Sequence, residues 1–544
     1  MSLRSKLTID RVLGALFFAA AIYCLVRSVI LCFSIDIWYD ELFSMEFSSR
    51  SAAELIGLTA RDVHPPLYYL ILRGFLLLGQ SLGIVGRSQG MLAPEIVAKL
   101  VSVLPFALLF IYNITTVRKH FGFLTAGIFS FAIVSMPQMP EYTTEIRMYS
   151  WAVFFVTAVM LHGFSLIRRM LSKSSTRWGI PDAIALWLYS AAAAYTHYYA
   201  AFCVGITYGI LVVLMLVYYL KYMKKKEDAP ANVNFRPLAM VIVSMNLTII
   251  SYIPWASVVL SQVGAVKENY WIQPVGLRSL GSCAKYLLKG YFSNDMIGSA
   301  LAVAFFVLIA VLFIRALIRA IMEKELKDIL MVSGFLMLPL LVAAGIIASI
   351  LIRPVFVSRY MLPAYGAFWL SVSAMASAEF EMLREKKKLA PILASALMVL
   401  VLVVGAVDFK TFIGNEEYRI VNMTRTRSLF EGIGSDTIII SNFNHVQALL
   451  SYYLNMGDEE YKIFLYQQEP EPLIYETVPG LDAVYDPIDI ANYLEGGKSV
   501  LFLGSFKSRE VLLQEWKDEL GITSENEGSY LMERYWFDVF RLGK

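Results

Sequence analysis

The chain is short of charged residues and of cysteine motifs. Charged residues make up only 17% of its 544 residues, whereas hydrophobic residues make up 58%, and the mean hydropathy is +0.59. Soluble domains contain about 25% charged and roughly 45–50% apolar residues. The four cysteines form no Cys-x-x-Cys pair, so neither a zinc knuckle nor a disulfide framework is indicated. These shortages exclude an ordinary soluble enzyme, a disordered chain and a disulfide scaffold, and they predict a polytopic membrane protein.

A large net charge, an internal repeat and a cleavable leader are also missing. The net charge of +3 gives no basis for nucleic-acid binding. The first apolar segment is longer than the apolar core of a signal peptide, contains Arg27 and is followed by no small-residue cleavage site. We therefore interpret it as a first membrane span.

Apolar segments long enough to cross a membrane recur along the first three quarters of the chain. A transmembrane helix needs about 20 mostly apolar residues. The sequence predicts eleven spans, at residues 12–33, 97–117, 122–138, 148–167, 181–199, 201–220, 237–260, 298–317, 329–351, 355–377 and 389–408. The segment 66–82 is shorter and is interrupted by Arg73, so we interpret it as a juxtamembrane helix.

The orientation follows from the basic residues, because cytoplasmic loops are enriched in Lys and Arg. With eleven spans, the basic clusters of the N-terminus and of every second loop fall on one side: Arg4, Lys6, Arg11, Arg118, Lys119, Arg168, Arg169, Lys221, Lys224, Lys225, Lys226, Arg315, Arg319, Arg384, Lys386, Lys387 and Lys388. This regularity predicts a cell-membrane protein with a cytoplasmic N-terminus and an extracytoplasmic C-terminal part.

Two large regions are expected outside the membrane, the first outer loop at residues 34–96 and the tail at 409–544. The tail has strand-like apolar runs at 437–440, 463–466 and 500–503, with helical patterns at 445–454 and 509–520. Strands that alternate with helices indicate a small α/β domain. We therefore predict a transmembrane module, residues 1–408, followed by an extracytoplasmic α/β domain, residues 409–544, which carries no catalytic motif.

Two adjacent carboxylates, Asp40 and Glu41, follow the outer end of the first span. Trp38 and Tyr39 precede them and fit the aromatic belt at a membrane interface. A carboxylate that is partly removed from water gains basicity and can act as a general base toward a substrate hydroxyl. A solvated loop start would contain the same residues, so the pair by itself leaves both interpretations open.

The same loop contains the stretch Asp-Val-His-Pro-Pro-Leu-Tyr-Tyr, residues 62–69. Its two prolines favour a helix start, because proline is tolerated in a first turn. They would hold Asp62 and His64 at the N-terminus of the juxtamembrane helix, where partial positive charge suits an anion. The alternative is a helix cap made by Asp62, with His64 incidental.

Further polar residues sit at the predicted outer ends of spans or in outer loops: Arg147, Tyr149, His197, Tyr198, Lys267, Arg359 and Tyr360. Each of them alone could be an interface anchor. Arg359 lies several residues inside an apolar run and needs a partner there. Because a guanidinium fork suits phosphate, these residues together fit a lipid-linked phosphate sugar at the membrane surface.

The combination resembles the polyprenyl-phosphate-sugar-dependent glycosyltransferases of the GT-C class. The most similar branch is family 39 with its bacterial relatives, the protein O-mannosyltransferases and lipid A aminoarabinose transferases. The resemblance covers roughly residues 10–370. It is carried by Asp40-Glu41 after the first span, by His64-Pro65-Pro66-Leu67-Tyr68-Tyr69, and by Arg147-Met148-Tyr149 with Thr196-His197-Tyr198-Tyr199 downstream.

This resemblance implies a multi-span fold with an active site that opens to the extracytoplasmic face. The donor would be a sugar on a polyprenyl phosphate, and transfer would invert the anomeric centre. Asp40 would be the catalytic base, Glu41 would position the acceptor or the base, and Asp62 and His64, with Tyr68 nearby, would shape the sugar or phosphate pocket. Some relatives use a divalent metal and others do not, and two oxygen ligands with a histidine are compatible with either.

The positions of Arg359 and Arg147 make them our candidates for phosphate contacts. Membrane lipid and an envelope acceptor are the other expected partners, but the sequence identifies neither the sugar nor the acceptor. A transporter or flippase of a lipid-linked saccharide is the alternative, although such proteins often show repeats and midplane charges. A receptor or scaffold that binds through its tail is a third possibility, which gives no reason for the loop carboxylates.

Overall fold

The computed structural model describes residues 3–171, 179–224, 235–266, 272, 274–352, 354–382, 389–457, 459–469 and 471–544. Lys267 lies outside the described residues, as do the basic loop residues Lys225, Lys226, Arg384, Lys386, Lys387 and Lys388. The chain divides into two compact units. The helical unit comprises residues 1–30, 59–71 and 99–412, and the sheet unit comprises residues 31–58, 72–98 and 413–544.

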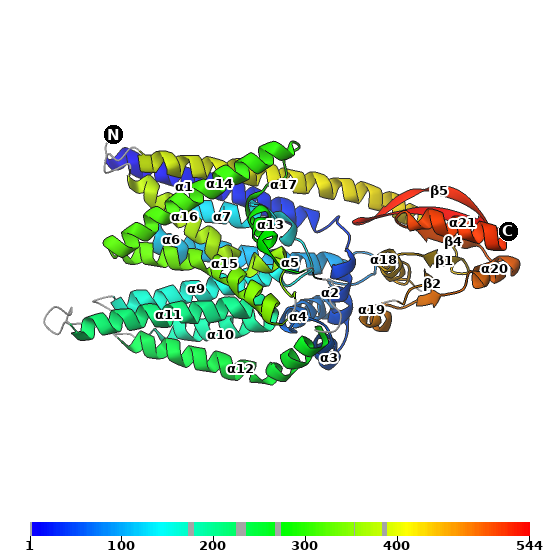
Figure 1. Ribbon diagram of the computed structural model, residues 1–544, viewed down its shortest axis with the longest axis horizontal. Helices are drawn as coiled ribbons and strands as arrows, with labels where there is room; N and C mark the ends of the chain where they lie inside the picture. The colour runs from blue at the N-terminus through cyan, green and yellow to red at the C-terminus, as the bar shows by residue number, and fades with distance from the viewer. Residues whose placement is uncertain are drawn as a thin grey trace. The chain divides into compact units, whose positions relative to one another are not determined.

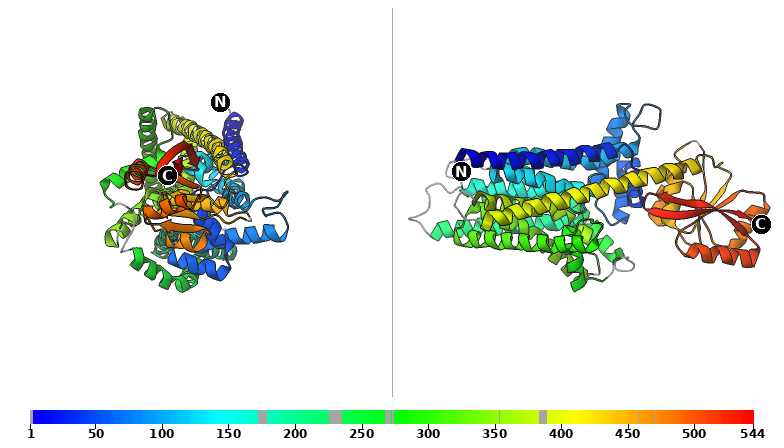
Figure 2. Two further views of the ribbon diagram at one scale, coloured as in Figure 1. Left: turned by 90° about the vertical axis from the view of Figure 1, so that its right-hand side faces the viewer. Right: turned by 90° about the horizontal axis from the view of Figure 1, so that it is seen from above.

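Long helices build the helical unit (Figure 1). In chain order the elements that lie mostly in it are α1 (Leu3–Leu31), α5 (Pro94–Tyr112), the π-helical turn η1 (Asn113–Val117), α6 (Arg118–Phe121), α7 (Phe123–Ser135), α8 (Met139–Tyr142), α9 (Tyr149–Leu171), α10 (Ile180–Thr196), α11 (Tyr198–Lys224), α12 (Arg236–Val266), α13 (Leu277–Leu288), α14 (Asp295–Met322), α15 (Leu326–Leu351), the 3₁₀ helix η2 (Ser358–Ala364), α16 (Tyr365–Glu381) and α17 (Leu389–Phe430). α17 has 42 residues, and Figure 2 shows it in yellow as one unbroken helix.

Eight helical stretches of the described chain are long and apolar enough to cross a membrane: Ile9–Leu31, Pro94–Phe121, Tyr149–Leu171, Tyr198–Lys221, Arg236–Gly264, Asp295–Met322, Leu326–Leu351 and Leu389–Phe430. The other three predicted spans coincide with α7, α10 and α16, which have 13, 17 and 17 residues. These helices are shorter than the about 20 residues that a span usually needs. The multi-span architecture is therefore confirmed, whereas the count of eleven is not.

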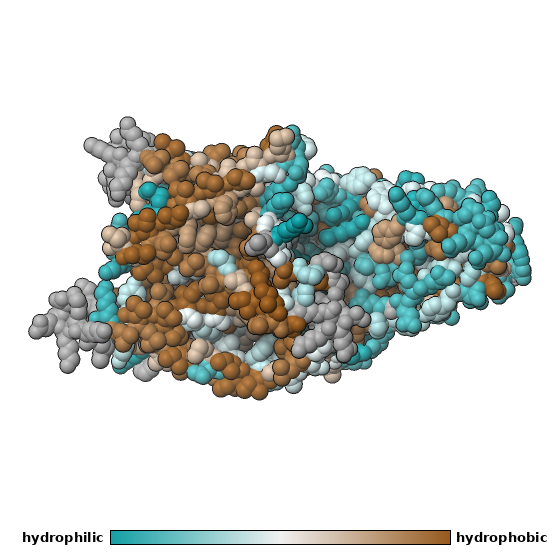
Figure 3. Space-filling view, viewed as in Figure 1, coloured by the Kyte–Doolittle hydropathy of each residue, from teal (hydrophilic) through white to brown (hydrophobic). Residues whose placement is uncertain are grey.

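Apolar side chains cover the outside of these helices. Ile253 of α12, Val303 of α14 and Ile350 of α15 are all exposed. Figure 3 shows brown, hydrophobic residues over the helical unit and mostly teal, hydrophilic residues over the sheet unit. An apolar surface of this extent is unfavourable in water but suits lipid.

The centre of the helical unit is α9, of whose apolar stretch 89% is buried. It packs against α10, α11, α12 and α16. Gly366 of α16 allows one of these close approaches, because a Cβ there would lie 1.8 Å from the hydroxyl oxygen of Thr157. α9 thereby holds the loops at its ends in fixed places.

The remaining helices and all strands belong wholly or in part to the sheet unit. They are α2 (Tyr39–Ser49), α3 (Ala52–Arg61), α4 (Leu67–Ser81), β1 (Ile438–Ser441), α18 (Asn444–Leu454), β2 (Ile463–Tyr466), α19 (Pro472–Thr477), β3 (Leu481–Val484), α20 (Pro487–Glu495), β4 (Val500–Gly504), α21 (Ser508–Leu520), β5 (Thr523–Met532) and β6 (Tyr535–Gly543). The juxtamembrane helix predicted at 66–82 corresponds to α4. The predicted strands correspond to β1, β2 and β4, and the predicted helices to α18 and α21.

The six strands form one mixed sheet in the order β3-β2-β1-β4-β6-β5. The first four are parallel, with Ile439 of β1 opposite Ile463 of β2, whereas β6 runs antiparallel to β4. Parallel strands are covered on both faces, which explains the continuous apolar runs of β1 and β4. One face shares a core with α20 and α21 around Phe502, Trp516 and Phe540. The α/β domain predicted for the tail is therefore confirmed.

Candidate functional site

The helical unit contains a cavity of about 750 Å³. Its walls come mainly from α11, α12 and the end of α15, and they are largely apolar. The polar residues that line it come from loops and helix ends: His64, His197, Tyr198, Tyr199, Gln262 and Tyr360. Sequence positions almost 300 apart thus meet around one hollow.

His197 lies among the aromatic residues of this site. It has extended backbone between α10 and α11. Its ring centroid is 5.9 Å from that of His64, 5.5 Å from that of Tyr149 and 5.4 Å from that of Tyr360. The backbone N–H of Tyr199 donates to Nδ1 of His197 at 3.1 Å. An imidazole that accepts at Nδ1 carries its proton on Nε2, so neutral His197 keeps a hydrogen-bond donor on the other side of its ring.

His64 and Asp62 precede α4, as the two prolines predict. Nδ1 of His64 lies 3.3 Å from Oδ2 of Asp62, and both side chains are largely buried. The contact with His64 explains the position of the Asp62 carboxylate. A capping hydrogen bond from Asp62 to α4 is not needed to explain it.

Gln262 of α12 fixes this segment from the opposite wall. Its side-chain N–H₂ group donates to the backbone carbonyls of Thr59 and Ala60 at 2.9 and 3.3 Å, and also to that of Asp62. Its side-chain oxygen accepts from the hydroxyl of Tyr198, which in turn accepts from Trp255 at 3.1 Å. The sequence interpretation missed Gln262, although an amide near the end of an apolar span was a signal that could have identified it.

The charges near the cavity come from arginine and carboxylate groups. Burial lowers the pKa of His64, and the guanidinium groups of Arg147 and Arg359 lower it further against the opposing effect of Asp62. Burial also lowers the pKa of His197, with the same two guanidinium groups and His64 adding to the effect. Both imidazoles are therefore neutral at pH 7, and the positive charge belongs to Arg147 and Arg359.

Two buried or half-buried carboxylates, Asp62 and Glu145, also lie near the site. Burial raises the pKa of Asp62, but the hydrogen bond and charge of His64, with Arg147 among the smaller causes, outweigh it, so the net pKa is lowered and Asp62 is ionised. Glu145 is buried as well, and it adds to the raised pKa of Tyr142, which is due first to burial and then to Tyr286. Glu145 therefore acts on the Tyr142 side of the site, whereas Asp62 acts on His64.

Tyr360 and Tyr199 connect the site to η2. Their rings stack with centroids 4.9 Å apart, and the Tyr199 hydroxyl donates to the Val355 carbonyl at 2.8 Å. The Arg359 guanidinium lies 5.9 Å from the centroid of the Tyr360 ring. The predicted residues Arg147, Tyr149, His197, Tyr198, Arg359 and Tyr360 are thus brought together with Asp62 and His64. Tyr68 is fully buried with its ring edge-on to Tyr69 at 5.4 Å, and it is not among the described residues that line the cavity.

Asp40 and Glu41 belong to the sheet unit, in the first turn of α2. The carboxylate of Glu41 accepts from the backbone N–H of Trp38 at 3.0 Å, which caps the start of this helix. Asp40 is only half-buried, and its charge acts on His445 and Tyr535 of the tail. The two adjacent carboxylates therefore have different environments: Glu41 caps α2, whereas Asp40 is half-buried near His445 and Tyr535.

A second apolar hollow of about 670 Å³ lies between α10, α11 and α12. It shares Ala201, Gly205 and Tyr252 with the first cavity, so the two are neighbours. Gly205 and Gly209 keep it wide, because a Cβ at either position would meet no atom within 4 Å. Together the hollows offer polar groups at one place and a long apolar wall beside it.

Within the part of the chain that the structure describes, no group of three or more His, Cys, Asp or Glu residues could hold a metal ion. Asp62 and His64 supply two ligand types that a divalent cation can use.

Comparison with solved structures identifies the fold. The crystal structure of ArnT from Cupriavidus metallidurans in the apo state matches with a TM-score of 0.54 and 13% sequence identity over 97% of both chains. The same protein bound to undecaprenyl phosphate matches with a TM-score of 0.49 and 13% identity over 97% of both chains. An oligosaccharyltransferase from Archaeoglobus fulgidus matches with a TM-score of 0.46 and 10% identity, over 90% of this chain and 69% of that one.

No protein-family model matches this chain, and no curated protein matches its sequence. At 13% identity, the likeness to apo ArnT, a lipid A aminoarabinose transferase, shows a shared fold. The helical unit and the mixed sheet of the tail thus share the GT-C fold of that structure.

Proposed function

We propose that this protein is an inverting glycosyltransferase that moves a sugar from a polyprenyl-phosphate donor to an acceptor hydroxyl. The observation that carries the proposal is the pair of neighbouring hollows in the helical unit. Two guanidinium groups and two neutral imidazoles lie near the first, and the second is an apolar wall of small residues. A phosphate head with a long apolar tail is the ligand chemistry that such a site fits.

In this proposal Arg359 and Arg147 bind the phosphate of the donor. Nε2–H of His197 is a hydrogen-bond donor for a phosphate or sugar oxygen, and Asp62 with His64 shapes the sugar pocket. The polyprenyl chain extends along α11 and α12 past Gly205 and Gly209. Positive charge that is placed in advance stabilises the phosphate as it leaves, because no reorganisation is needed during the reaction.

The transfer is a single displacement. The acceptor oxygen forms a bond to the anomeric carbon while the bond from that carbon to the phosphate oxygen breaks. The bonding electrons leave with the polyprenyl phosphate, and Asp40 takes the proton of the acceptor hydroxyl. General-base catalysis of this kind contributes about 10²–10⁴-fold to a rate. Inversion at the anomeric carbon follows from one displacement, and no covalent enzyme intermediate is required.

We also propose the membrane arrangement that the basic loops predict. Residues 1–408 form the membrane module with a cytoplasmic N-terminus, and residues 409–544 lie outside the cytoplasm together with the loop 34–96. The reaction would then take place at the extracytoplasmic face, which makes an envelope lipid, polymer or protein the acceptor.

The test is a transfer assay in cells and with purified protein. Mass spectrometry of envelope lipids, polymers and proteins from cells with and without this gene product should show one missing sugar. Asp40→Asn should abolish the transfer while the protein still inserts, and Asp489→Asn, a change at an exposed carboxylate of α20, should leave it intact. Full turnover by Asp40→Asn would refute the base assignment. Movement of a labelled lipid between leaflets without a new glycosidic bond would instead support a flippase.

A further inference from the structure

Four consecutive residues that lead into Asp40 are each held by the C-terminal part of the sheet unit. They are Asp36, Ile37, Trp38 and Tyr39, and their partners come from α17, from α18, from the residue before α19 and from the turn between β5 and β6. Contacts from four separate places on one short segment determine its position far more strictly than one contact would.

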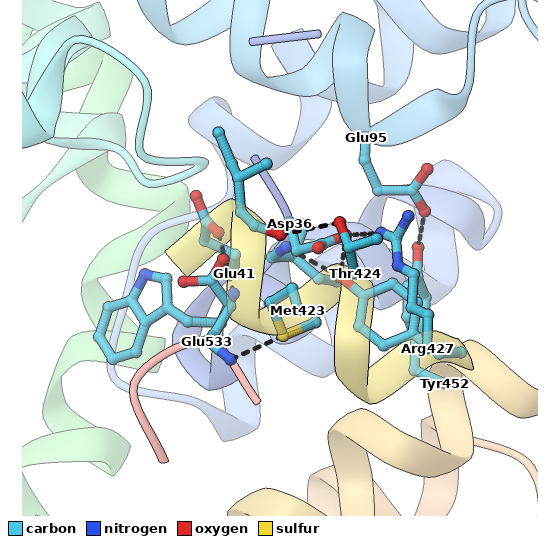
Figure 4. A network of polar contacts seen from close by, with 12 residues as sticks. Asp36, Glu41, Glu95, Met423, Thr424, Arg427, Tyr452 and Glu533 are labelled. Carbon is cyan, nitrogen blue, oxygen red and sulfur yellow. Dashed lines mark hydrogen bonds and ion pairs between the residues drawn. The ribbon is translucent and has the colours of Figure 1, made fainter. Parts of the chain in front are cut away.

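Tyr453 of α18 makes two of these contacts with a single hydroxyl. The hydroxyl accepts from the backbone N–H of Ile37 at 2.9 Å and donates to Oδ1 of Asp36 at 3.3 Å. Asp36 also forms an ion pair with Arg427 of α17, which Figure 4 shows close to Asp36. The backbone just before α2 is therefore fixed by a side chain more than 400 positions away.

Trp38 and Tyr39 are held through their rings. The Arg534 guanidinium lies 4.0 Å from the Trp38 ring centroid. The Tyr39 hydroxyl donates to Glu471 at 2.9 Å, and its ring lies 3.7 Å from that of His445. Trp38 precedes α2 and Tyr39 is its first residue, so any movement of the segment would also move Asp40.

Residues 72–98 also belong to the sheet unit, and they are held by Tyr452, the residue before Tyr453. The hydroxyl of Tyr452 donates to Glu95 (Figure 4). Glu95 also forms an ion pair with Arg87 at 2.6 Å. Tyr452 and Tyr453 are consecutive residues of α18, and their rings are 5.5 Å apart. One helix thus connects residues 36–37 with residue 95.

We propose that the C-terminal domain serves to position Asp40, with Tyr453 as the principal positioning residue. The inference rests on the proposed function, because it assigns a purpose to this placement only if Asp40 is the base. A base must lie within hydrogen-bond reach of the proton it removes. A misplacement of about 1 Å can cost about 10²-fold in rate, even when the mutated residue is far from the chemistry.

The alternative is that these contacts only add stability. The two explanations differ in what a small change does. If Tyr453 positions Asp40, the loss of its hydroxyl should lower kcat without changing the KM for the donor. If it only stabilises the fold, a change of comparable size elsewhere in the domain should have the same effect.

Tyr453→Phe is the test, and Tyr461→Phe is its matched control. The Tyr461 hydroxyl donates to the carbonyl of Ile433 at 2.9 Å, inside the C-terminal part and away from residues 36–39. We expect Tyr453→Phe to lower kcat by about 10- to 100-fold, with the donor KM unchanged. Tyr461→Phe should keep the kcat of the natural protein. Tyr39→Phe, which removes only the bond to Glu471, should lower kcat in the same direction as Tyr453→Phe.

Hydrogen exchange supplies a measurement that does not depend on activity. In full-length protein, amide exchange of a peptide covering residues 34–43 should become faster in Tyr453→Phe and should stay the same in Tyr461→Phe. An unchanged kcat in Tyr453→Phe would overturn the proposal, whether or not amide exchange becomes faster. If the natural protein transfers no sugar at all, the proposed function fails, and the exchange data still show whether Tyr453 holds the segment.

Discussion

The side-chain amide of Gln262 donates to the backbone carbonyl of Asp62, 200 positions earlier in the chain. The same amide also donates to the backbone carbonyls of Thr59 and Ala60. One side chain of α12 therefore fixes the segment that leads to Asp62 and His64. Gln262 carries no charge and belongs to no recognised motif, and yet it fixes the positions of the ionisable residues Asp62 and His64.

Replacing Gln262 by leucine should loosen this segment. The buried carbonyl of Thr59 and the partly buried carbonyls of Ala60 and Asp62 lose a donor, and an unsatisfied buried polar group costs about 1–3 kcal/mol. We expect a lower unfolding temperature in detergent and a higher KM for the donor. Asn246→Ala is the control, because Asn246 lies exposed on the same helix and only bonds the carbonyl of Ile242. Equal effects of both variants would contradict the role of Gln262.

Arg359→Lys should weaken binding of the donor even though the charge is kept. A guanidinium can bind phosphate through two parallel hydrogen bonds, whereas an ammonium cannot. We expect the donor KM to rise by about tenfold, which corresponds to about 1.4 kcal/mol. Arg278→Lys, at an exposed position of α13, should leave the KM unchanged. An unchanged KM in Arg359→Lys would remove Arg359 from the phosphate site.

Gly209→Leu should block the apolar hollow without touching the polar residues. The side chain would enter space that is open beside α11. We expect the KM for a long-chain polyprenyl donor to rise, while the KM for a donor with a short lipid chain stays the same. Gly414→Leu, at an open position of α17, controls for replacing a helical glycine. An equal loss for both donors would indicate that the chain does not lie in this hollow.

His445 should make stability depend on pH. Burial lowers its pKa to about 4, against the opposing effect of Asp40. Between about pH 6.5 and pH 4, the unfolded chain binds a proton here that the folded chain does not, so this group makes stability fall as the pH falls. Tyr39 and Asp40 from the α2 side and Tyr535 from β6 face it.

The measurement is thermal unfolding of the natural protein and of His445→Gln from pH 7 to pH 5. Glutamine does not titrate, so the unfolding temperature of the natural protein should fall relative to that of the variant as the pH decreases. The comparison also removes the opposite contribution of Glu46, whose pKa burial raises to about 7. A constant difference across this range would contradict the prediction.

A buried charge cluster should dominate the stability of the helical unit. Glu379 of α16 pairs with Arg315 at 2.9 Å and with Arg319, which also pairs with Asp328 at 2.9 Å. Removing one partner of a buried pair costs about 3–5 kcal/mol, because an uncompensated charge remains. Glu379→Gln should therefore lower the unfolding temperature strongly. Glu381→Gln should have a much smaller effect, because the Glu381 side chain is 42% exposed and lies 3.7 Å from its partner Lys327.

The sequence by itself determined the class of fold and most local elements. Apolar runs marked every helix that is long enough to cross a membrane, because lipid demands a continuous apolar surface. Runs such as those of β1, β2 and β4 marked buried parallel strands. β3, whose sequence Leu-Asp-Ala-Val is interrupted by an aspartate, and β5, whose first four residues are exposed, gave no such signal. The two prolines before α4 correctly placed Asp62 and His64 ahead of a helix.

Only the tertiary structure decided which polar residues meet. Each motif is local, whereas His64, His197 and Tyr360 come together because α9 holds the surrounding helices at fixed distances. Asp40 and Glu41 are adjacent in the sequence, and only the structure shows that their environments differ. The Glu41 side chain caps α2, whereas Asp40 lies near His445 and Tyr535. The role of Gln262 and the attachment of residues 36–39 to the tail depend on hydrogen bonds across hundreds of positions, and local patterns carry no information about such pairs.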